Sequence, residues 1–169
     1  MSALPSWRTP LFGPATATLC NQVDIAVAPT RVSDFFADFK NFTQIHPLIV
    51  AIVEREPRPD VPDLPGAPAR RWYKVTDRLA GGPLPVHIHY DVALTAAGPQ
   101  ALLFEAWQRP RIRLHNRISW HALPQGGTRV QEELALQVPS LLLPLVQRMA
   151  QAAHADSFAR LKMRLEKEP

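Results

Sequence analysis

The fold is decided by residues 126–167, which read GGTRVQEELALQVPSLLLPLVQRMAQAAHADSFARLKMRLEK. The Gly126-Gly127 pair is typical of a hairpin turn, and the alternation of apolar and polar residues that follows predicts a strand over residues 128–138. Pro139 ends that strand, and Ser140 is a good N-cap for a helix that continues to the end of the quoted stretch. The chain therefore closes with a strand that leads directly into one long helix.

The predicted final helix carries two apolar stripes, about a third of a turn apart. One stripe consists of Leu142, Val146, Met149 and Ala153, and the other of Leu143, Ala150, Phe158, Leu161 and Leu165. A helix that is apolar over so broad an arc is buried on more than one side. We expect one stripe to grip a sheet and the other to contact loops, the N-terminal arm or a ligand.

Upstream of this stretch the same period-two pattern predicts six more strands, with two short helices after the first of them. The strands are expected at residues 16–27, 48–56, 70–79, 86–95, 101–108 and 112–123, and the helices at 31–38 and 39–45. Residues 1–15 hold three prolines and a glycine without any period, so they are read as an irregular N-terminal arm. Residues 16–169 then form one α+β domain, a curved seven-stranded antiparallel sheet with two short helices and a long C-terminal helix.

Strand 86–95 has the cleanest alternation. Val86, Ile88, Tyr90, Val92 and Leu94 alternate with His87, His89, Asp91, Ala93 and Thr95. The first set is expected to face the interior because it is the apolar one. Strand 101–108 is apolar on both faces, so its orientation stays open.

Composition places the chain among ordinary globular domains, with 46% hydrophobic and 20% charged residues in a length of 169. There is no run of eighteen apolar residues, so no membrane span is expected. The N-terminus lacks a basic segment followed by an apolar run, so it does not read as a secretory signal. Cys20 is the only cysteine, which makes a reducing cytoplasm the simplest location.

The formal net charge is +4, and the one local concentration of basic residues is Arg109, Arg111, Arg113 and Arg117. On a strand, Arg111, Arg113 and Arg117 lie an even number of residues apart and would face the same side. We favour a solvated outer sheet face over a phosphate-binding stripe, because few aromatic residues are interleaved with them. No nucleic-acid partner is expected.

Three local motifs carry a resemblance to a known family: residues 23–36 (VDIAVAPTRVSDFF), residues 38–42 (DFKNF) and residues 126–130 (GGTRV). With the order of elements, the chain resembles the START/polyketide-cyclase (SRPBCC) superfamily, which includes the major birch-pollen allergen. The resemblance covers roughly residues 16–166 and implies a helix-grip fold. It also implies a hydrophobic cavity between the sheet and the final helix, open near the two short helices.

Asn116 and Glu132 lie within apolar alternation, on strands that the Gly126-Gly127 hairpin should pair. An inward carboxylate must be hydrogen-bonded or protonated. The two side chains could orient a ligand, with Glu132 as an acid or base and Tyr90 as a third catalytic candidate. Alternatively, Glu132 lies at the cavity mouth or pairs with an arginine.

His87, His89 and Asp91 have metal-like spacing on one strand face. Turning them inward would expose the apolar set of the same strand, at about 1.5–3 kcal/mol per large side chain. We therefore expect solvated histidines, no metal and no cofactor. His154 and Asp156 on the final helix are expected to be solvated as well.

The leading hypothesis is a protein that binds a hydrophobic or aromatic small molecule, such as a lipid or a polyketide-like compound, in an internal cavity. The predicted lining is Tyr73, Val75, Ile88, Tyr90, Val92, Phe104, Leu114, Asn116, Ile118, Trp120, Val130, Glu132, Leu134, Val146, Met149 and Ala153. One alternative is a cyclase or dehydratase that uses the cavity acid/base residues. Another is a module that binds a protein or an RNA surface.

Overall fold

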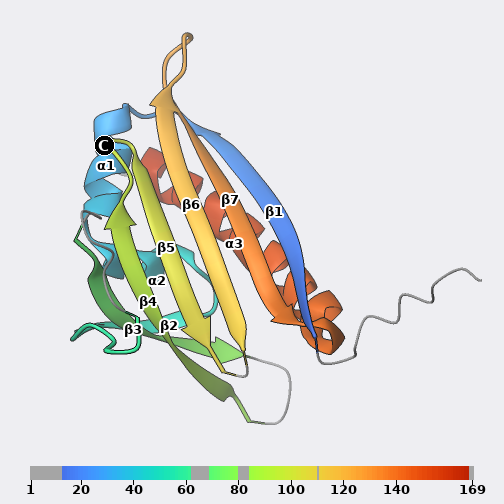
Figure 1. Ribbon diagram of the computed structural model, residues 1–169. Helices are drawn as coiled ribbons and strands as arrows, with labels where there is room; N and C mark the ends of the chain where they lie inside the picture. Colours follow the sequence, from blue (N-terminus) through green and yellow to red (C-terminus); the bar gives the residue numbers. More distant parts are fainter. Residues whose placement is uncertain (1–12, 62–68, 80–83, 110, 168–169) are drawn as a thin grey trace, which may run out of the picture.

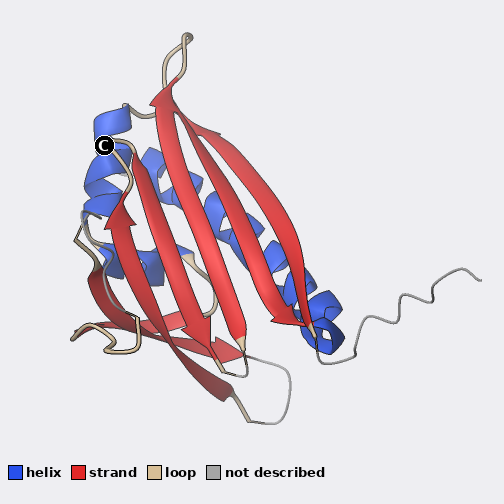
Figure 2. Ribbon diagram, in the orientation of Figure 1, coloured by secondary structure: helices blue, strands red, loops and turns tan. Residues whose placement is uncertain are grey.

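The computed structural model describes residues 13–61, 69–79, 84–109 and 111–167. Its centre is a seven-stranded antiparallel sheet with the strand order β1-β7-β6-β5-β4-β3-β2. The sheet curves around the long helix α3 (Leu143–Lys167), which lies behind it in Figure 1, and the short helices α1 and α2 lie on the same face of the sheet. Figure 2 shows the same separation of helices and strands into two layers. The predicted α+β helix-grip fold is confirmed.

The boundaries of the elements agree closely with the predicted ones. The strands are β1 (Pro14–Ile25), β2 (Ile49–Arg55), β3 (Arg71–Leu79), β4 (Val86–Ala96), β5 (Ala101–Gln108), β6 (Ile112–Ala122) and β7 (Thr128–Pro139). The helical elements are α1 (Pro29–Ala37), the 3-10 helix η1 (Phe39–Asn41), α2 (Phe42–Ile45), the 3-10 helix η2 (Ser140–Leu142) and α3 (Leu143–Lys167). Strand β1 takes in two residues assigned to the predicted arm, and the arm's residues 1–12 lie outside the described part of the chain.

The start of the long helix differs from the prediction. Ser140 opens the 3-10 turn η2, and α3 begins only at Leu143, so Ser140 is not the N-cap of α3. The backbone N–H of Ser140 instead donates to the carbonyl oxygen of Gly13 at 2.9 Å. This bond ties the junction between β7 and α3 to the start of β1, which is a tertiary restraint that a local capping rule does not contain.

The two faces of the sheet follow the predicted alternation where the strands cover the core. Val92 and Leu94 of β4 are buried, but Val86 is 58% exposed because the start of β4 runs past the edge of the core. The prediction that Val86 faces the interior is therefore wrong. In β5, Phe104 and Ala106 face inward, and Trp107 on the outer face stacks on Trp72 at 5.4 Å. This outer stack explains why β5 is apolar on both faces.

The β6–β7 hairpin allows a direct test of the turn geometry. Gly126 and Gly127 both have positive φ, at 91° and 86°, but only at Gly127 would a Cβ atom lie 2.6 Å from the carbonyl oxygen of Ile25. We expect Gly127→Ala to lower the free energy of unfolding by about 2 kcal/mol and Gly126→Ala by about 1 kcal/mol. Urea denaturation of both variants checks this, and equal losses would contradict the role of the contact with β1.

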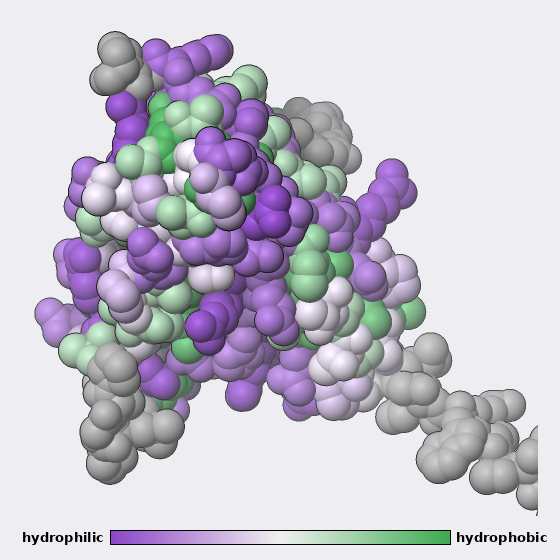
Figure 3. All heavy atoms as spheres, turned by 90° about the horizontal axis from the view of Figure 1, so that it is seen from above, coloured by the Kyte–Doolittle hydropathy of each residue, from purple (hydrophilic) through white to green (hydrophobic). Residues whose placement is uncertain are grey.

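The surface at the hairpin end of the molecule is mainly hydrophilic, with hydrophobic residues scattered among the polar ones (Figure 3). This face therefore shows no single large apolar patch of the kind that marks a docking surface. Among the described residues, no helix combines the length and the apolar character needed to cross a membrane.

Candidate functional site

A pocket of about 90 Å³ lies between the inner face of the sheet, the short helical segment from α1 to α2, and α3. Its wall is formed by Phe36, Phe39, Phe42, Ile45, His46, Ile49, Tyr90, Val92, Phe104, Ala106, Leu114, Asn116, Ile118, Glu132, Leu134, His154, Ser157, Phe158 and Leu161. Only His46, Tyr90, Leu114 and His154 among them are partly exposed, so the pocket reaches the surface at their end.

Aromatic rings form the closed end of the pocket. Phe39 of η1 lies 5.2 Å from Phe42 and 5.4 Å from Phe104, as measured between ring centroids. Phe36 lies 5.6 Å from Phe42 and 5.2 Å from Trp120. Because η1 and α2 are only three and four residues long, few backbone hydrogen bonds hold these rings in place.

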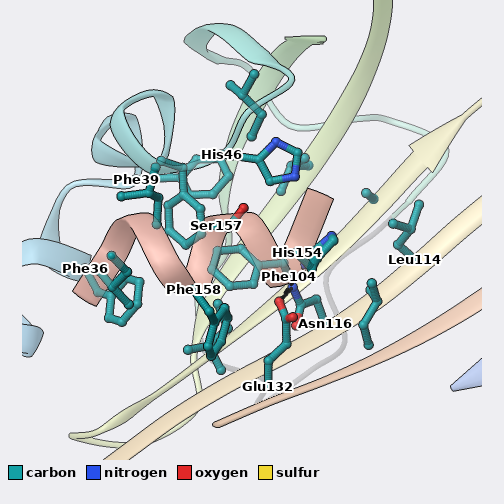
Figure 4. Close-up of a pocket in the computed structure, with 18 of the residues that line it drawn as sticks. Phe36, Phe39, His46, Phe104, Leu114, Asn116, Glu132, His154, Ser157 and Phe158 are labelled. Carbon is teal, nitrogen blue, oxygen red and sulfur yellow. Dashed lines mark hydrogen bonds and ion pairs between the residues drawn. The ribbon is translucent and has the colours of Figure 1, made fainter. Parts of the chain in front are cut away.

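A cluster of polar side chains lies in the otherwise apolar wall. Figure 4 shows Glu132, Asn116 and His154 pointing toward one another, with the aromatic rings beyond them. Asn116 Nδ2 donates to Glu132 Oε1 at 2.6 Å, and Asn21 Nδ2 donates to Glu132 Oε2 at 2.9 Å. His154 Nδ1 lies 2.8 Å from Glu132 Oε1. Strands β1, β6 and β7 and helix α3 thus meet at one carboxylate.

The Glu132 carboxyl is held in its ionised form. Glu132 is 4% exposed, and burial alone would raise its pKa, but the hydrogen bonds from His154, Asn116 and Asn21 together lower it below the usual value. Among the described residues, the recorded partners of the carboxylate are Asn116, Asn21 and His154, and none of them is an arginine. The prediction that Glu132 and Asn116 face inward on paired strands agrees with the structure, in which Ile118 lies opposite Glu132.

Two histidines meet at the open end of the pocket. The rings of His46 and His154 pack edge to face, with centroids 5.4 Å apart. The backbone N–H of Leu48 donates to His46 Nδ1 at 3.4 Å. Burial, followed by the neighbouring His154, lowers the pKa of His46 to about 3. His46 is therefore neutral at physiological pH, with its proton on Nε2.

Tyr90 acts as a donor on the β4 side of the pocket. Its hydroxyl donates to Asp77 Oδ1 at 3.1 Å. Burial and the adjacent Asp77 carboxylate raise the pKa of Tyr90 well above its usual value. Burial also raises the pKa of Asp77 to about 6, against the opposing hydrogen bond from Tyr90. Tyr90 therefore keeps its proton at neutral pH.

One polar atom in the wall has no partner. Because the Glu132 carboxylate can only accept a hydrogen bond, the amide nitrogen Nδ2 of Asn116 must face it. The amide oxygen Oδ1 of Asn116 then points away from Glu132. Asn116 Oδ1 is buried and makes no hydrogen bond with any described residue. An unpaired buried acceptor costs about 1–3 kcal/mol. A ligand donor in the pocket would remove that cost.

The structure places half of the predicted lining residues on the pocket wall: Tyr90, Val92, Phe104, Leu114, Asn116, Ile118, Glu132 and Leu134. The others lie elsewhere. Tyr73, Val75, Trp120 and Val130 are buried in the core behind the wall, Ile88 is half-buried beyond the open end, and Val146, Met149 and Ala153 precede the part of α3 that lines the pocket. Val146 packs instead on Leu19, Leu134 and Leu136.

Sequence reasoning missed the helical side of the wall. His154 was expected to be solvated, and Ser157 and Phe158 were not assigned to the pocket. A signal for His154 exists, since it lies four residues after Ala150 and four before Phe158, in the middle of the second apolar stripe. Asp156 lies outside the pocket wall and is ion-paired with Arg160 at 2.9 Å.

The H-x-H strand face points away from the pocket. His87 and His89 are exposed, and the Asp91 carboxylate is paired with Arg55 and Arg58. Within the described ranges, no group of three or more histidine, cysteine, aspartate or glutamate side chains is placed to hold a metal ion.

Comparison with known proteins identifies the fold. No family model and no curated protein matches the chain. Among solved structures, a START superfamily protein from Mycobacterium smegmatis has a TM-score of 0.68 at 17% identity, covering 90% of this chain and 99% of that one. The Zhui aromatase/cyclase from Streptomyces sp. R1128 has a TM-score of 0.68 at 10% identity, covering 90% and 95%.

The di-domain ARO/CYC protein BexL from the BE-7585A biosynthetic pathway has a TM-score of 0.64 at 14% identity, with 95% of this chain covered. This chain spans about half the length of BexL, covering 52% of it. The chain therefore has the START/SRPBCC-type helix-grip fold that its sequence resembles. Identities this low show the fold alone, and the function has to be argued from the pocket.

Proposed function

We propose that this protein binds a hydrophobic small molecule in the pocket beneath α3, and that the molecule donates a hydrogen bond to Asn116 Oδ1. The observation that carries the proposal is this buried acceptor, which has no hydrogen-bond partner among the described residues and lies in a mainly apolar wall. Apolar burial would supply most of the affinity, and the polar cluster would set the orientation. His46 Nε2–H, near the open end, is a donor for a carbonyl or ether oxygen of the same molecule.

The size of the pocket limits how a ligand enters. Its volume of about 90 Å³ is below the roughly 300–1,000 Å³ of sites for drug-sized ligands. It is also below the roughly 150 Å³ of an engineered cavity that takes up benzene. Even a single ring therefore requires the wall to widen. We assign that movement to Phe39 and Phe42, because they lie on the two shortest helical elements of the wall.

A matched pair of probes tests the donor requirement. Phenol and toluene have nearly the same shape, but only phenol donates a hydrogen bond. We expect phenol to bind at least about tenfold more tightly than toluene, although toluene is the more hydrophobic of the two. Isothermal titration calorimetry with each compound measures the difference.

Two asparagine variants provide the control. Asn116→Leu and Asn21→Leu each remove one hydrogen bond to Glu132, but only Asn116→Leu removes the acceptor in the pocket. The preference for phenol should vanish in Asn116→Leu and persist in Asn21→Leu. Equal loss in both variants, or no binding of either probe, would count against the proposal. Native mass spectrometry of the protein from its own host would then identify the natural ligand.

We propose acid/base catalysis of the cyclase or dehydratase kind as the second candidate, because of the bond between His154 and Glu132. Since Glu132 Oε1 only accepts, His154 Nδ1 donates to it, and Nε2 is the ring nitrogen left for proton exchange with a ligand. Glu132 thus orients an imidazole that can act as an acid/base group.

The two candidates differ in what happens to the bound compound. A dehydratase would release a product lighter by one water, which mass spectrometry detects. His154→Gln should then bind the co-purifying compound without converting it. A carrier would return the compound unchanged with either protein. The cytoplasm is the proposed location in both cases, on the evidence of the single cysteine.

A further inference from the structure

The sheet carries a second concave site, mostly on its outer face, which shares only Tyr90 with the pocket. A groove of about 730 Å³ lies at the lower ends of β4, β5 and β6 as drawn in Figure 1, on the side turned away from α3. Six cationic side chains line it: Arg55, Arg58, Lys74, Arg109, Arg111 and Arg113. Two carboxylates, Asp60 and Asp91, also line it. The formal charge of the groove is therefore +4, as large as the net charge of the whole chain.

The register of the sheet builds this groove. Lys74 lies opposite Asp91, Asp91 opposite Trp107, and Trp107 opposite Arg113, which gives one row of side chains across four strands. Trp107 forms a firm floor, because it stacks on Trp72 and the guanidinium of Arg58 lies 5.6 Å from its ring centroid. Charges above a fixed apolar floor act through a lower dielectric than charges in free solvent.

The two carboxylates in the groove are already neutralised. Asp91 is paired with Arg55 and Arg58, and Asp60 is paired with Arg58. The side chains of Lys74, Arg109, Arg111 and Arg113 have no hydrogen-bond or ion-pair partner in the described part of the chain. Four like charges therefore converge without compensation, and a polyvalent anion between them would relieve their repulsion.

The backbone at Arg111 adds an independent observation. Arg111 has a φ of 54°, and it is the one described residue other than glycine with a positive φ. Glycine adopts this conformation without steric cost, whereas an arginine does so at a cost. Unfavourable backbone conformations that persist are concentrated at binding and catalytic sites. The turn between β5 and β6 thus holds a guanidinium at the groove where glycine would be the cheaper residue.

We propose that this outer groove binds a small polyvalent phosphate, such as a triphosphate group, through Lys74, Arg109, Arg111 and Arg113. Guanidinium groups bind phosphate oxygens in bidentate fashion, and the groove has the volume of a small-molecule site. The inference does not depend on the proposed function of the pocket, because none of these four cationic residues lines the pocket.

Calorimetric titrations with inorganic triphosphate, pyrophosphate and phosphate test the proposal. We expect triphosphate to bind at least about tenfold more tightly than phosphate, and binding to weaken as NaCl rises from about 50 to about 200 mM. Arg113→Gln should reduce the affinity for triphosphate about tenfold. Arg117→Gln is the matched control, because Arg117 lies on the same strand and face but opposite Glu133 and outside the groove, and it should change the affinity less than about twofold.

The variant Arg111→Gly distinguishes a loss of triphosphate affinity from a loss of folding stability. It should weaken triphosphate binding while the melting temperature stays the same or rises, since glycine relieves the backbone conformation. Three results would overturn the proposal: no saturable binding at about 1 mM triphosphate, equal weakening by Arg113→Gln and Arg117→Gln, or much tighter binding of a short single-stranded RNA. The last result would make the groove a nucleic-acid surface instead.

Discussion

Glu132→Ala is expected to lower the free energy of unfolding by about 3 kcal/mol. The substitution leaves three donors without their acceptor, on Asn116, Asn21 and His154, of which Asn116 is buried and the other two are partly buried. Breaking a buried charged cluster costs more than the cluster contributed, because the remaining polar groups stay desolvated. Urea denaturation at pH 7 measures the loss.

The neighbouring carboxylate provides the control for this prediction. Glu133 follows Glu132 on β7 but points to the outer face and is exposed. Glu133→Ala should change the free energy of unfolding by less than about 0.5 kcal/mol. Similar losses in the two variants would show that the cluster does not hold β1, β6, β7 and α3 together. Glu132→Gln, which keeps the shape but loses the charge, should fall between wild type and Glu132→Ala.

The residues that the strands contribute to the pocket wall could be predicted from the sequence. Side chains alternate between the two faces of a strand, so the apolar set shows which face is buried. Asn116 and Glu132 interrupt apolar alternation, and the Gly126-Gly127 hairpin places their strands side by side, so their meeting follows from local pattern alone. The same argument placed Tyr90, Val92 and Leu134 inward. It failed at the start of β4, where the strand extends beyond the core, so that Val86 is exposed and Ile88 is only half-buried.

The helical half could not be predicted in the same way. An apolar stripe shows which side of a helix is buried, but not which part of its length lies over a cavity. Helix α3 has 25 residues, so it extends about 37 Å and is longer than the pocket. Its first half, with Val146 and Met149, packs along β1 and β7, and its second half lines the pocket. His154 was missed because a stripe defined by apolar residues passes over a histidine in its middle.

The small pocket volume has a related cause. Phe36, Phe39 and Phe42 were predicted as residues of two short helices, and nothing in their spacing indicates how far they reach over the sheet. In the structure they fill most of the space between the sheet and α3. The cavity implied by the resemblance to the START/SRPBCC superfamily is present, but these aromatic rings keep it small.

His46 is expected to make the fold sensitive to acid. Its pKa is lowered to about 3 in the folded protein, from 6.5 for an unperturbed histidine. Between these pH values His46 is protonated in the unfolded chain but neutral in the folded protein. The free energy of unfolding therefore falls as the pH decreases through this window. Between pH 6.5 and about pH 4.5 the loss amounts to about 2 kcal/mol, somewhat less than 1.36 kcal/mol per pH unit because half of the unfolded chains are already protonated at pH 6.5. The lowered pKa of Glu132 contributes stability that stays constant in this window, because that contribution is lost only when the pH falls below 4.5.

The surroundings of His46 decide how this loss must be measured. His154, Glu132, Arg160 and Asp156 all act on its charge, and burial acts most strongly. Asp77, with a pKa raised to about 6, has the opposite sign: the folded protein binds its proton more tightly, so stability rises as pH falls from about 6 toward 3.8. A wild-type curve alone therefore mixes two opposing contributions.

Comparison of wild type with His46→Gln isolates the histidine. The variant keeps Asp77 and Glu132 but has no imidazole to protonate, so its stability relative to wild type should increase by about 2 kcal/mol between pH 6.5 and about pH 4.5. Urea denaturation at both pH values gives this difference. His87→Gln, at an exposed histidine on the outer face, should run parallel to wild type. If His46→Gln also runs parallel, His46 is protonated inside the fold, and the neutral donor assigned to it at the mouth of the pocket does not exist.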